Sequence, residues 1–168
     1  VNDLEKFYKE ASKHHNEGHL NNAFRSYSTV ASILSKSLYA DSSFSEATKL
    51  QPKPLLSKSV FLRINYEISM GRGAIRHEQG LIKEALSFFV QASKFNDKDT
   101  PLLSLISHLA IKVKNFQLAN AMYIKWIDLD PHNPEPWYFF AVHLEKNHNG
   151  NRSEESLEKY LEAMSVLK

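Results

Sequence analysis

Residues 80–92 read Gly80-Leu81-Ile82-x-x-Ala85-x-x-x-Phe89-x-x-Ala92, and residues 114–126 read Lys114-Asn115-Phe116-x-x-Ala119-x-x-x-Tyr123-x-x-Trp126. In both stretches a turn leads into an apolar segment, with an alanine at the same place and an aromatic residue four positions after it. The spacing is helical, because residues three and four apart share one face of an α-helix. The second stretch follows the first by 34 residues. A fixed period of this length indicates an array of helical hairpins, each burying its apolar face against the next.

The same arrangement extends over the rest of the chain. We expect one repeat domain over residues 1–168, all-α, with about four antiparallel hairpins and about eight helices. The expected units are 4–39, 55–97, 100–131 and 134–167. Thr100 and Pro101 are predicted to begin a helix, as a hydroxyl N-cap and as a proline at the first helical position. Ser153 is predicted to cap the last helix, in which Tyr160 and Ala163 continue the pattern.

The first unit is longer than the period allows, by about 28 residues. Part of this excess extends its second helix toward Tyr39. The remainder, residues 40–54, contains three serines and two prolines and is typical of an irregular insertion loop. Pro54 is predicted to start the next helix, which must then be unusually long.

The composition is that of an ordinary folded domain. Hydrophobic residues make up 42% and charged residues 24% of the 168 residues, and the net charge of +2 is small for a nucleic-acid-binding protein. Cysteine is absent, which excludes disulfides and thiolate chemistry and permits a reducing compartment. No apolar run approaches the roughly 20 residues that cross a bilayer. We expect an intracellular protein away from membranes, and the start at Val1 suggests a segment of a longer chain.

The repeated positions resemble the tetratricopeptide (TPR) family over nearly the whole chain. The resemblance implies a TPR-like α-solenoid that presents a surface to other proteins. It also implies a non-catalytic role, without cofactors.

A narrower resemblance rests on the order of three elements. The elements are Phe7-Tyr8-x-x-Ala11 with Ala23-Phe24-x-x-Tyr27, then Leu50-Gln51-Pro52-Lys53-Pro54-Leu55-Leu56-Ser57-Lys58-Ser59, then Leu109-Ala110-Ile111-Lys112. This order resembles the N-terminal region of the scaffold subunit of the HIR histone-chaperone complex, called cabin in vertebrates. The resemblance implies a nuclear protein of chromatin assembly, with histone-chaperone subunits among its partners.

A different resemblance leaves an alternative open. Trp137-Tyr138-Phe139-Phe140, followed by Leu144-Glu145, is similar to the half-TPR repeats of RNA-processing scaffolds. Those repeats carry an arginine in their second helix, where this chain has Asn120-Ala121-Met122-Tyr123. The alternatives to a chromatin scaffold are therefore an RNA-processing scaffold and a direct nucleic-acid-binding repeat.

The family resemblance also indicates which residues line the inner face of the first helices. One TPR subfamily holds a terminal carboxylate there with lysine, asparagine and arginine, but none of the matching residues here has a cationic or amide side chain to bind that carboxylate. They are Tyr8, Ser12, Gly71, Pro101 and Leu105. The inner face is instead apolar and aromatic, and the predicted partner-binding groove consists of Tyr8, Met70, Leu105, His108, Ile111, Tyr138, Phe139 and Val142. An amphipathic helix or an extended peptide would bury these side chains, unless the insertion loop or further repeats already cover them.

Charged clusters favour no other function. Basic residues gather at Lys6, Lys9, Lys13, His14 and His15, and again at Arg72, Arg76 and His77. Glutamates interrupt both groups, so we interpret them as solvated helix faces and do not expect nucleic-acid binding. Self-association through exposed end faces of the array is an expectation of the repeat architecture.

No metal site or active site is expected. His15 and His19 have a spacing that can hold a metal ion, but Gly18 lies between them and no third ligand is evident. The chain has no phosphate-binding P-loop and no HExxH motif. Gly71-Arg72-Gly73 lacks the strand and third glycine of a dinucleotide site, so we expect no enzyme activity and no cofactor.

Overall fold

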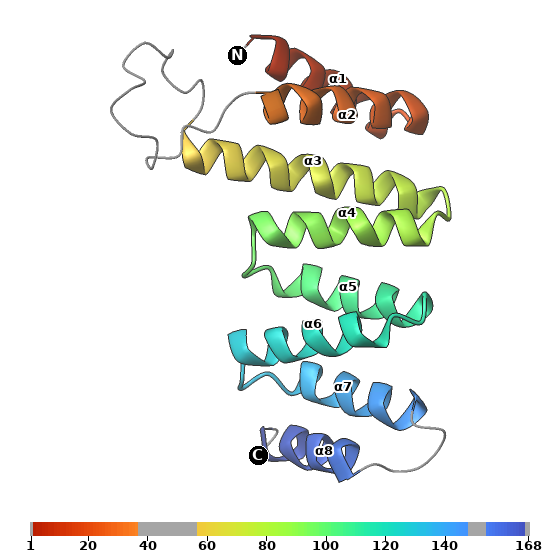
Figure 1. Cartoon of the computed structure of the whole chain (residues 1–168), viewed down its shortest axis with the longest axis vertical. Coiled ribbons are helices and arrows are strands. Elements are labelled where there is room, and N and C mark those ends of the chain that lie inside the picture. The colour runs from red at the N-terminus through yellow and green to blue at the C-terminus, as the bar shows by residue number, and fades with distance from the viewer. Residues whose placement is uncertain (1, 37–56, 148–153, 167–168) are drawn as a thin grey trace. The chain divides into compact units, whose positions relative to one another are not determined.

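A computed structural model of the chain describes residues 2–36, 57–147 and 154–166. These residues form eight α-helices and no strand (Figure 1). The helices are α1 (Asn2–Asn16), α2 (Leu20–Lys36), α3 (Lys58–Glu78), α4 (Ile82–Phe95), α5 (Thr100–Lys112), α6 (Phe116–Leu129), α7 (Pro134–Asn147) and α8 (Glu154–Val166). None of them is both long and apolar enough to span a bilayer.

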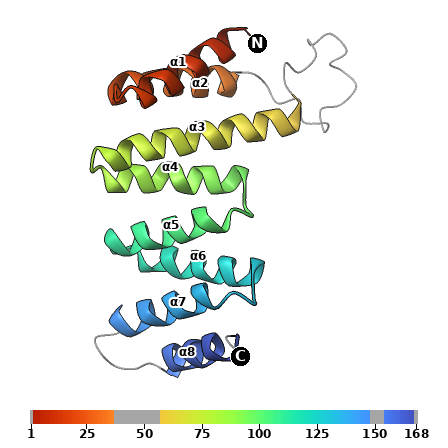
Figure 2. The same ribbon diagram turned by 180° about the vertical axis from the view of Figure 1, so that it is seen from behind.

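The helices belong to two compact units. Unit 1, Val1–Asp97, contains α1 to α4, and unit 2, Lys98–Lys168, contains α5 to α8. Within each unit, consecutive helices pair as hairpins: α1 with α2 and α3 with α4 in unit 1, α5 with α6 and α7 with α8 in unit 2. Figure 2 shows the same pairs from behind. The predicted fold class, all-α with sequential hairpins, is confirmed.

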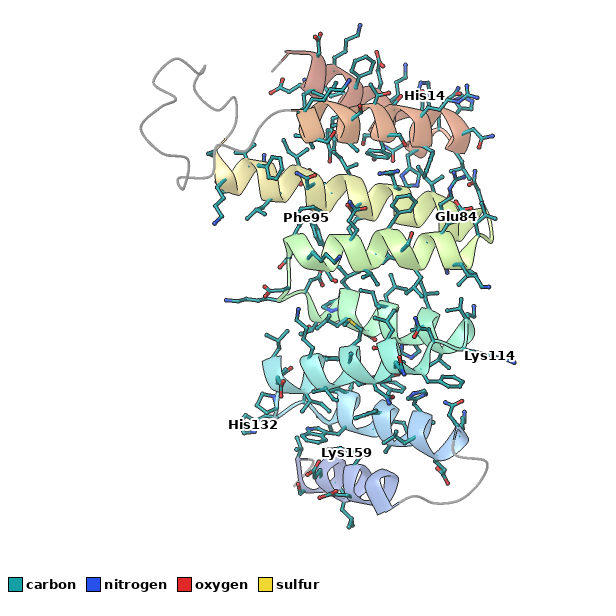
Figure 3. All side chains as sticks on the ribbon, viewed as in Figure 1. His14, Glu84, Phe95, Lys114, His132 and Lys159 are labelled. Atoms are coloured by element: carbon teal, nitrogen blue, oxygen red, sulfur yellow. The ribbon has the colours of Figure 1, made fainter. Side chains whose placement is uncertain are left out.

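The turn inside a hairpin recurs with one backbone geometry. Gly18, Gly80 and Lys114 each have a positive φ, of 77°, 75° and 62°. In each turn the amide of the next residue bonds a carbonyl five positions back, for example Leu81 N to Arg76 O at 2.8 Å and Asn115 N to Ala110 O at 2.8 Å. This is the Schellman end of a helix, which favours glycine because a Cβ is strained at positive φ. Lys114 (labelled in Figure 3) adopts the conformation despite its Cβ.

Two glycines of α3 admit aromatic rings from its neighbours. A Cβ on Gly73 would lie 2.7 Å from Cε1 of Phe89 on α4, so Gly73 is a packing position. A Cβ on Gly71 would lie 2.8 Å from the ring of Tyr27 on α2. Gly71, which sequence reasoning placed on the inner face, is therefore also a packing position.

Two helix starts differ from expectation. α5 begins after Asp99, whose carboxylate accepts a hydrogen bond from Leu102 N at 3.1 Å, so Asp99 is the N-cap and Thr100 is not. Pro101 still falls within the first turn, where its missing N–H costs no intrahelical bond. α3 begins at Lys58 after the N-cap Ser57, and its 21 residues confirm the predicted long helix. Pro54, Ser153 and the loop 40–54 lie outside the described residues.

Each unit has its own apolar core. The core of unit 1 consists of Leu4, Ala11, Ala23, Tyr27, Val30, Leu34, Ile68 and Ile75. The core of unit 2 consists of Leu103, Tyr123, Trp126, Ile127, Phe140 and Leu144. In unit 2 the rings of Tyr123 and Phe140 stack at 5.5 Å and join α6 to α7. The side chains of Tyr160 and Ala163, which the repeat pattern predicts in α8, lie outside the described residues.

Candidate functional site

The eight residues of the predicted groove divide between the two units. Tyr8 and Met70 lie in unit 1, on α1 and α3. The other six lie in unit 2, on the first helices of its two hairpins. They are Leu105, His108 and Ile111 on α5, and Tyr138, Phe139 and Val142 on α7, and we call these six residues the α5–α7 surface.

Aromatic rings connect the two helices of the α5–α7 surface. The rings of His108 and Phe139 meet edge to face at 5.4 Å, and those of Phe139 and Tyr138 meet edge to face at 5.6 Å. None of the six side chains is fully buried. The surface therefore contains a connected series of three rings together with aliphatic side chains that water can reach.

The residues of this surface differ in how firmly they are held. Ile111 and Phe139 pack against the core of unit 2 and are partly buried. Tyr138, by contrast, is 52% exposed. The Nδ1 of His108 lies 2.8 Å from the carbonyl oxygen of Ser104. Because a carbonyl oxygen only accepts, Nδ1 is the donor, and this hydrogen bond orients the ring. The Nε2 of His108 is then available to accept a hydrogen bond from another molecule.

The predicted groove residue Tyr8 is engaged within unit 1. Its hydroxyl donates to Oε2 of Glu67 on α3 at 2.9 Å, and its ring meets that of Tyr27 edge to face at 6.2 Å. Burial, and then the hydrogen bond to Glu67, raise the pKa of Tyr8 to about 12. Tyr8 therefore ties α1 to α3. Met70 is partly buried on α3.

A cluster that the sequence did not reveal lies between α2, α3 and α4. It consists of Phe24 on α2, Arg72 and Arg76 on α3, and Phe88 on α4, and we call it the arginine–phenylalanine cluster. The Arg72 guanidinium carbon lies 4.2 Å from the Phe88 ring centroid, and that of Arg76 lies 3.7 Å from the Phe24 centroid. Both arginines are partly buried over aromatic faces. The interpretation of Arg72 and Arg76 as a solvated helix face was therefore wrong.

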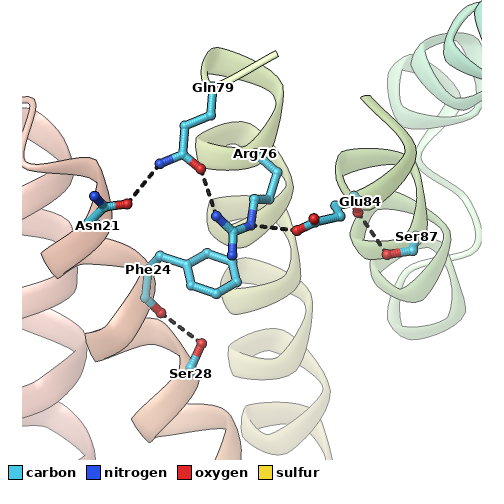
Figure 4. Close-up of polar contacts among 7 residues, drawn as sticks. All are labelled: Asn21, Phe24, Ser28, Arg76, Gln79, Glu84 and Ser87. Carbon is cyan, nitrogen blue, oxygen red and sulfur yellow. Dashed lines mark hydrogen bonds and ion pairs between the residues drawn. The ribbon is translucent and has the colours of Figure 1, made fainter. Parts of the chain in front are cut away.

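The two arginines of this cluster have different polar surroundings. Arg76 Nε pairs with Oε2 of Glu84 at 2.9 Å, and its Nη1 donates to Gln79, whose amide donates on to Asn21 on α2 (Figure 4). Arg72 has no ion pair within the described part of the chain, and its buried Nε lacks a hydrogen-bond partner there. Burial, and then the nearby charge of Arg76, lower the pKa of Arg72. The arrangement fastens three helices together, and it could be recognised only once α2 and α4 were known to flank α3.

The histidines do not pair as their spacing suggested. His15 lies 3.2 Å from Oε1 of Glu78 and meets the Tyr27 ring edge to face, so it faces α2 and α3. His14, Glu17 and His19 come together instead at the α1–α2 turn. His143 is buried in the packing of unit 2, where its Nε2 lies 2.9 Å from Oδ1 of Asn120.

Comparison with known proteins concerns the fold. No protein-family model and no curated protein matches the chain. Among solved structures, MamA is 13% identical with a TM-score of 0.61, over 98% of this chain and 78% of that chain. A tetratricopeptide repeat protein from Parabacteroides merdae is 17% identical with a TM-score of 0.62, over 99% of this chain and 58% of that chain. The chain has a TPR-like fold.

A third similar structure carries a description of its binding. YrrB, described as a TPR protein with an unusual peptide-binding site, is 12% identical with a TM-score of 0.52, over 95% of this chain and 84% of that chain. Identities of this size show a shared fold alone. The TPR resemblance seen in the sequence is confirmed at that level.

Proposed function

We propose that this chain is a non-catalytic scaffold for protein–protein interaction, and that the α5–α7 surface is its binding surface. The proposal rests on one observation above all, the continuous edge-to-face series His108, Phe139 and Tyr138 on two neighbouring first helices. Exposed apolar groups gathered in one place mark interaction sites, and aromatic side chains dominate their energetics. The peptide-binding site described for YrrB shows that a similar fold can hold a peptide.

The expected partner is an amphipathic helix or an extended peptide with apolar anchors. The apolar side chains of such a ligand would cover Tyr138 and contact the partly buried Phe139 and Ile111. It would also present a donor to Nε2 of His108. Because helices α5 and α7 are already supported by the core of unit 2, binding orders little of this chain, and affinity depends on complementarity.

The narrower proposal concerns the cellular partner. We propose a scaffold of chromatin assembly in the nucleus, on the strength of the sequence resemblance to the HIR scaffold subunit. Three residues of the first hairpin, Ala11, Ala23 and Tyr27, are core residues of unit 1. These positions support a TPR-like hairpin.

The test is a pull-down from nuclear extract with the immobilised chain, followed by mass spectrometry. A Tyr138→Ala variant is compared with Ile124→Ala, a matched control that removes a similarly exposed side chain (50% against 52%) from α6 of the same unit. The proposal expects specific proteins that Tyr138→Ala loses and Ile124→Ala keeps. Equal recovery by the two variants would refute the assignment of the α5–α7 surface.

The identity of the recovered proteins decides the narrower proposal. Histone-chaperone subunits support a chromatin scaffold. Splicing or ribosome-assembly factors would support the RNA-processing alternative, and recovery that nuclease abolishes would indicate direct nucleic-acid binding. A Phe139→Ala variant adds a check on folding, because loss of its circular dichroism melting transition would show that this ring serves the core.

A further inference from the structure

Three side chains with metal-binding atoms converge at the α1–α2 turn. The ligand atoms of His14, Glu17 and His19 all lie within 4.8 Å of one another. The Oε2 atom of Glu17 lies between the two imidazoles, 3.9 Å from Nδ1 of His14 and 3.5 Å from Nδ1 of His19. The two rings are 5.9 Å apart and tilted at 58°.

The backbone of this turn holds the three residues in place. His14 lies in the last turn of α1, and its carbonyl accepts a hydrogen bond from the amide of His19 at 2.8 Å. The amide of Glu17 bonds the carbonyl of Lys13 at 3.0 Å, and Gly18 makes the reversal with a φ of 77°. Because all three donors depend on one hydrogen-bonded turn, their convergence needs no long-range contact. Little ordering is then required for an ion to bind.

One atom of the group is left unsatisfied. Nδ1 of His14 is buried and has no hydrogen-bond partner among the described residues, since 3.9 Å to Glu17 is too long for a hydrogen bond. Buried polar atoms normally have a partner. A cation among the three side chains would supply one.

The donor set indicates which ion fits. Two imidazole nitrogens and one carboxylate oxygen are ligands that Zn²⁺ accepts, at about 2.0–2.2 Å each. We propose that His14, Glu17 and His19 bind one Zn²⁺ ion, which clips the end of α1 to the start of α2 and leaves one coordination position to water. The expectation of no metal site considered His15 with His19. The structure replaces His15, which faces Glu78, with His14, and provides Glu17 as the third ligand.

In the described part of the chain, Lys13 is the one lysine or arginine that pairs with Glu17 and would compete with the metal ion. Among the described residues, Lys13 Nζ lies 3.9 Å from Oε1 of Glu17, and its side chain is 72% exposed. This exposure leaves Lys13 free to turn toward water when Zn²⁺ binds. A Lys13→Gln variant should therefore bind Zn²⁺ more tightly than the unmodified chain.

The test is calorimetric titration of the chelator-treated, dialysed chain with Zn²⁺. We expect one ion per chain and a higher melting temperature in its presence. His14→Gln and His19→Gln should each weaken this binding by at least about tenfold, because a lost ligand costs no less than a lost second-shell contact. The controls His77→Gln and His132→Gln alter exposed histidines elsewhere and should bind as the unmodified chain does.

The outcomes separate a built site from general affinity of histidines for Zn²⁺. A tetrahedral Co²⁺ absorption spectrum that disappears in His19→Gln would support the site. His19 is 61% exposed, so this variant should retain the circular dichroism melt of the parent chain. The proposal is overturned if the parent chain shows no saturable binding. It is equally overturned if His19→Gln and His132→Gln bind Zn²⁺ alike.

Discussion

The two units differ in the state of the groove side chains on the first helices of their hairpins. In unit 1, the hydroxyl of Tyr8 on α1 is bonded to Glu67 on α3, so the side chain that would meet a partner is already engaged. In unit 2, the rings of His108 and Phe139 meet edge to face on the first helices, and Tyr138 beside them is half exposed. The difference shows that a repeat pattern locates a face of a helix. Whether that face is available to a partner depends on single polar contacts.

The largest expected effect on stability comes from a core residue of α7, compared with a surface residue of the same helix. Phe140→Ala should lower the free energy of unfolding by about 3–5 kcal/mol, because the ring is 1% exposed and stacks on Tyr123. Tyr138→Ala, two residues earlier on the same helix, should change it by less than about 0.5 kcal/mol. Urea titration followed by circular dichroism measures both. Similar losses for the two variants would mean that Tyr138 belongs to the core and that the α5–α7 surface is not open.

The second largest effect on stability is expected where α3 and α4 approach closely in unit 1. In Gly73→Ala, the added Cβ would lie 2.7 Å from the Phe89 ring. Overpacking of this kind costs about 1–3 kcal/mol, against a gain of about 1 kcal/mol in helix propensity, so we expect a net loss of about 1 kcal/mol. Adding Phe89→Leu should relieve the crowding introduced at position 73. If Gly73→Ala instead raises the melting temperature, the contact is looser than the structure indicates.

The Tyr8–Glu67 hydrogen bond joins α1 to α3 and should make the stability of the chain depend on pH in the alkaline range. Burial and this hydrogen bond raise the pKa of Tyr8 to about 12, above the value of about 10 for an unfolded tyrosine. The protonated phenol therefore stabilises the fold fully below about pH 10, and this contribution is lost as the pH rises toward 12. Burial likewise raises the pKa of Tyr123 to about 12, so some alkaline loss remains in any Tyr8 variant.

Tyr8→Phe isolates the contribution of unit 1. It should cost about 1 kcal/mol at neutral pH, where the lost hydrogen bond matters. It should also reduce the dependence of stability on pH between 10 and 12 relative to the parent chain. Melting curves across this range, with phenolate absorbance as a second signal, provide the measurement. An unchanged alkaline slope would show that Tyr8 is not held by Glu67 in solution.

The smallest effect compares equivalent turns of the two units. Lys114→Gly should stabilise the chain by about 0.5–1 kcal/mol, because glycine adopts the φ of 62° without the strain of a Cβ. Gly80→Ala, at the equivalent turn with a φ of 75°, should destabilise it by a similar amount. Opposite signs confirm that the turns share one geometry. Effects of the same sign would contradict it.

Much of the fold could be predicted because its determinants are local. The recurrence of Ala85 and Phe89 at Ala119 and Tyr123 depends only on spacing within a helix, and Gly73 lies at a position that requires a small residue. The N-cap of α5 was misplaced by one residue because Asp99 and Thr100 are both good caps, and only the carboxylate contact distinguishes them.

The side-chain clusters could not be predicted for a different physical reason. Arg72 and Arg76 share one face of α3, as their spacing indicates, but Phe24 and Phe88 reach them from helices distant in the sequence. Helical spacing likewise paired His15 with His19. The left-handed residue Gly18 reverses the chain between these two histidines and brings His14 to His19 instead.

α3 is longer than the helix it pairs with. α3 has 21 residues and α4 has 14, so at 1.5 Å per residue the start of α3 extends about 10 Å past the end of its hairpin partner. Phe61 and Ile64, on this extension, pack against the core of unit 1. The first residues of α3 therefore extend the core of unit 1 beyond the end of α4.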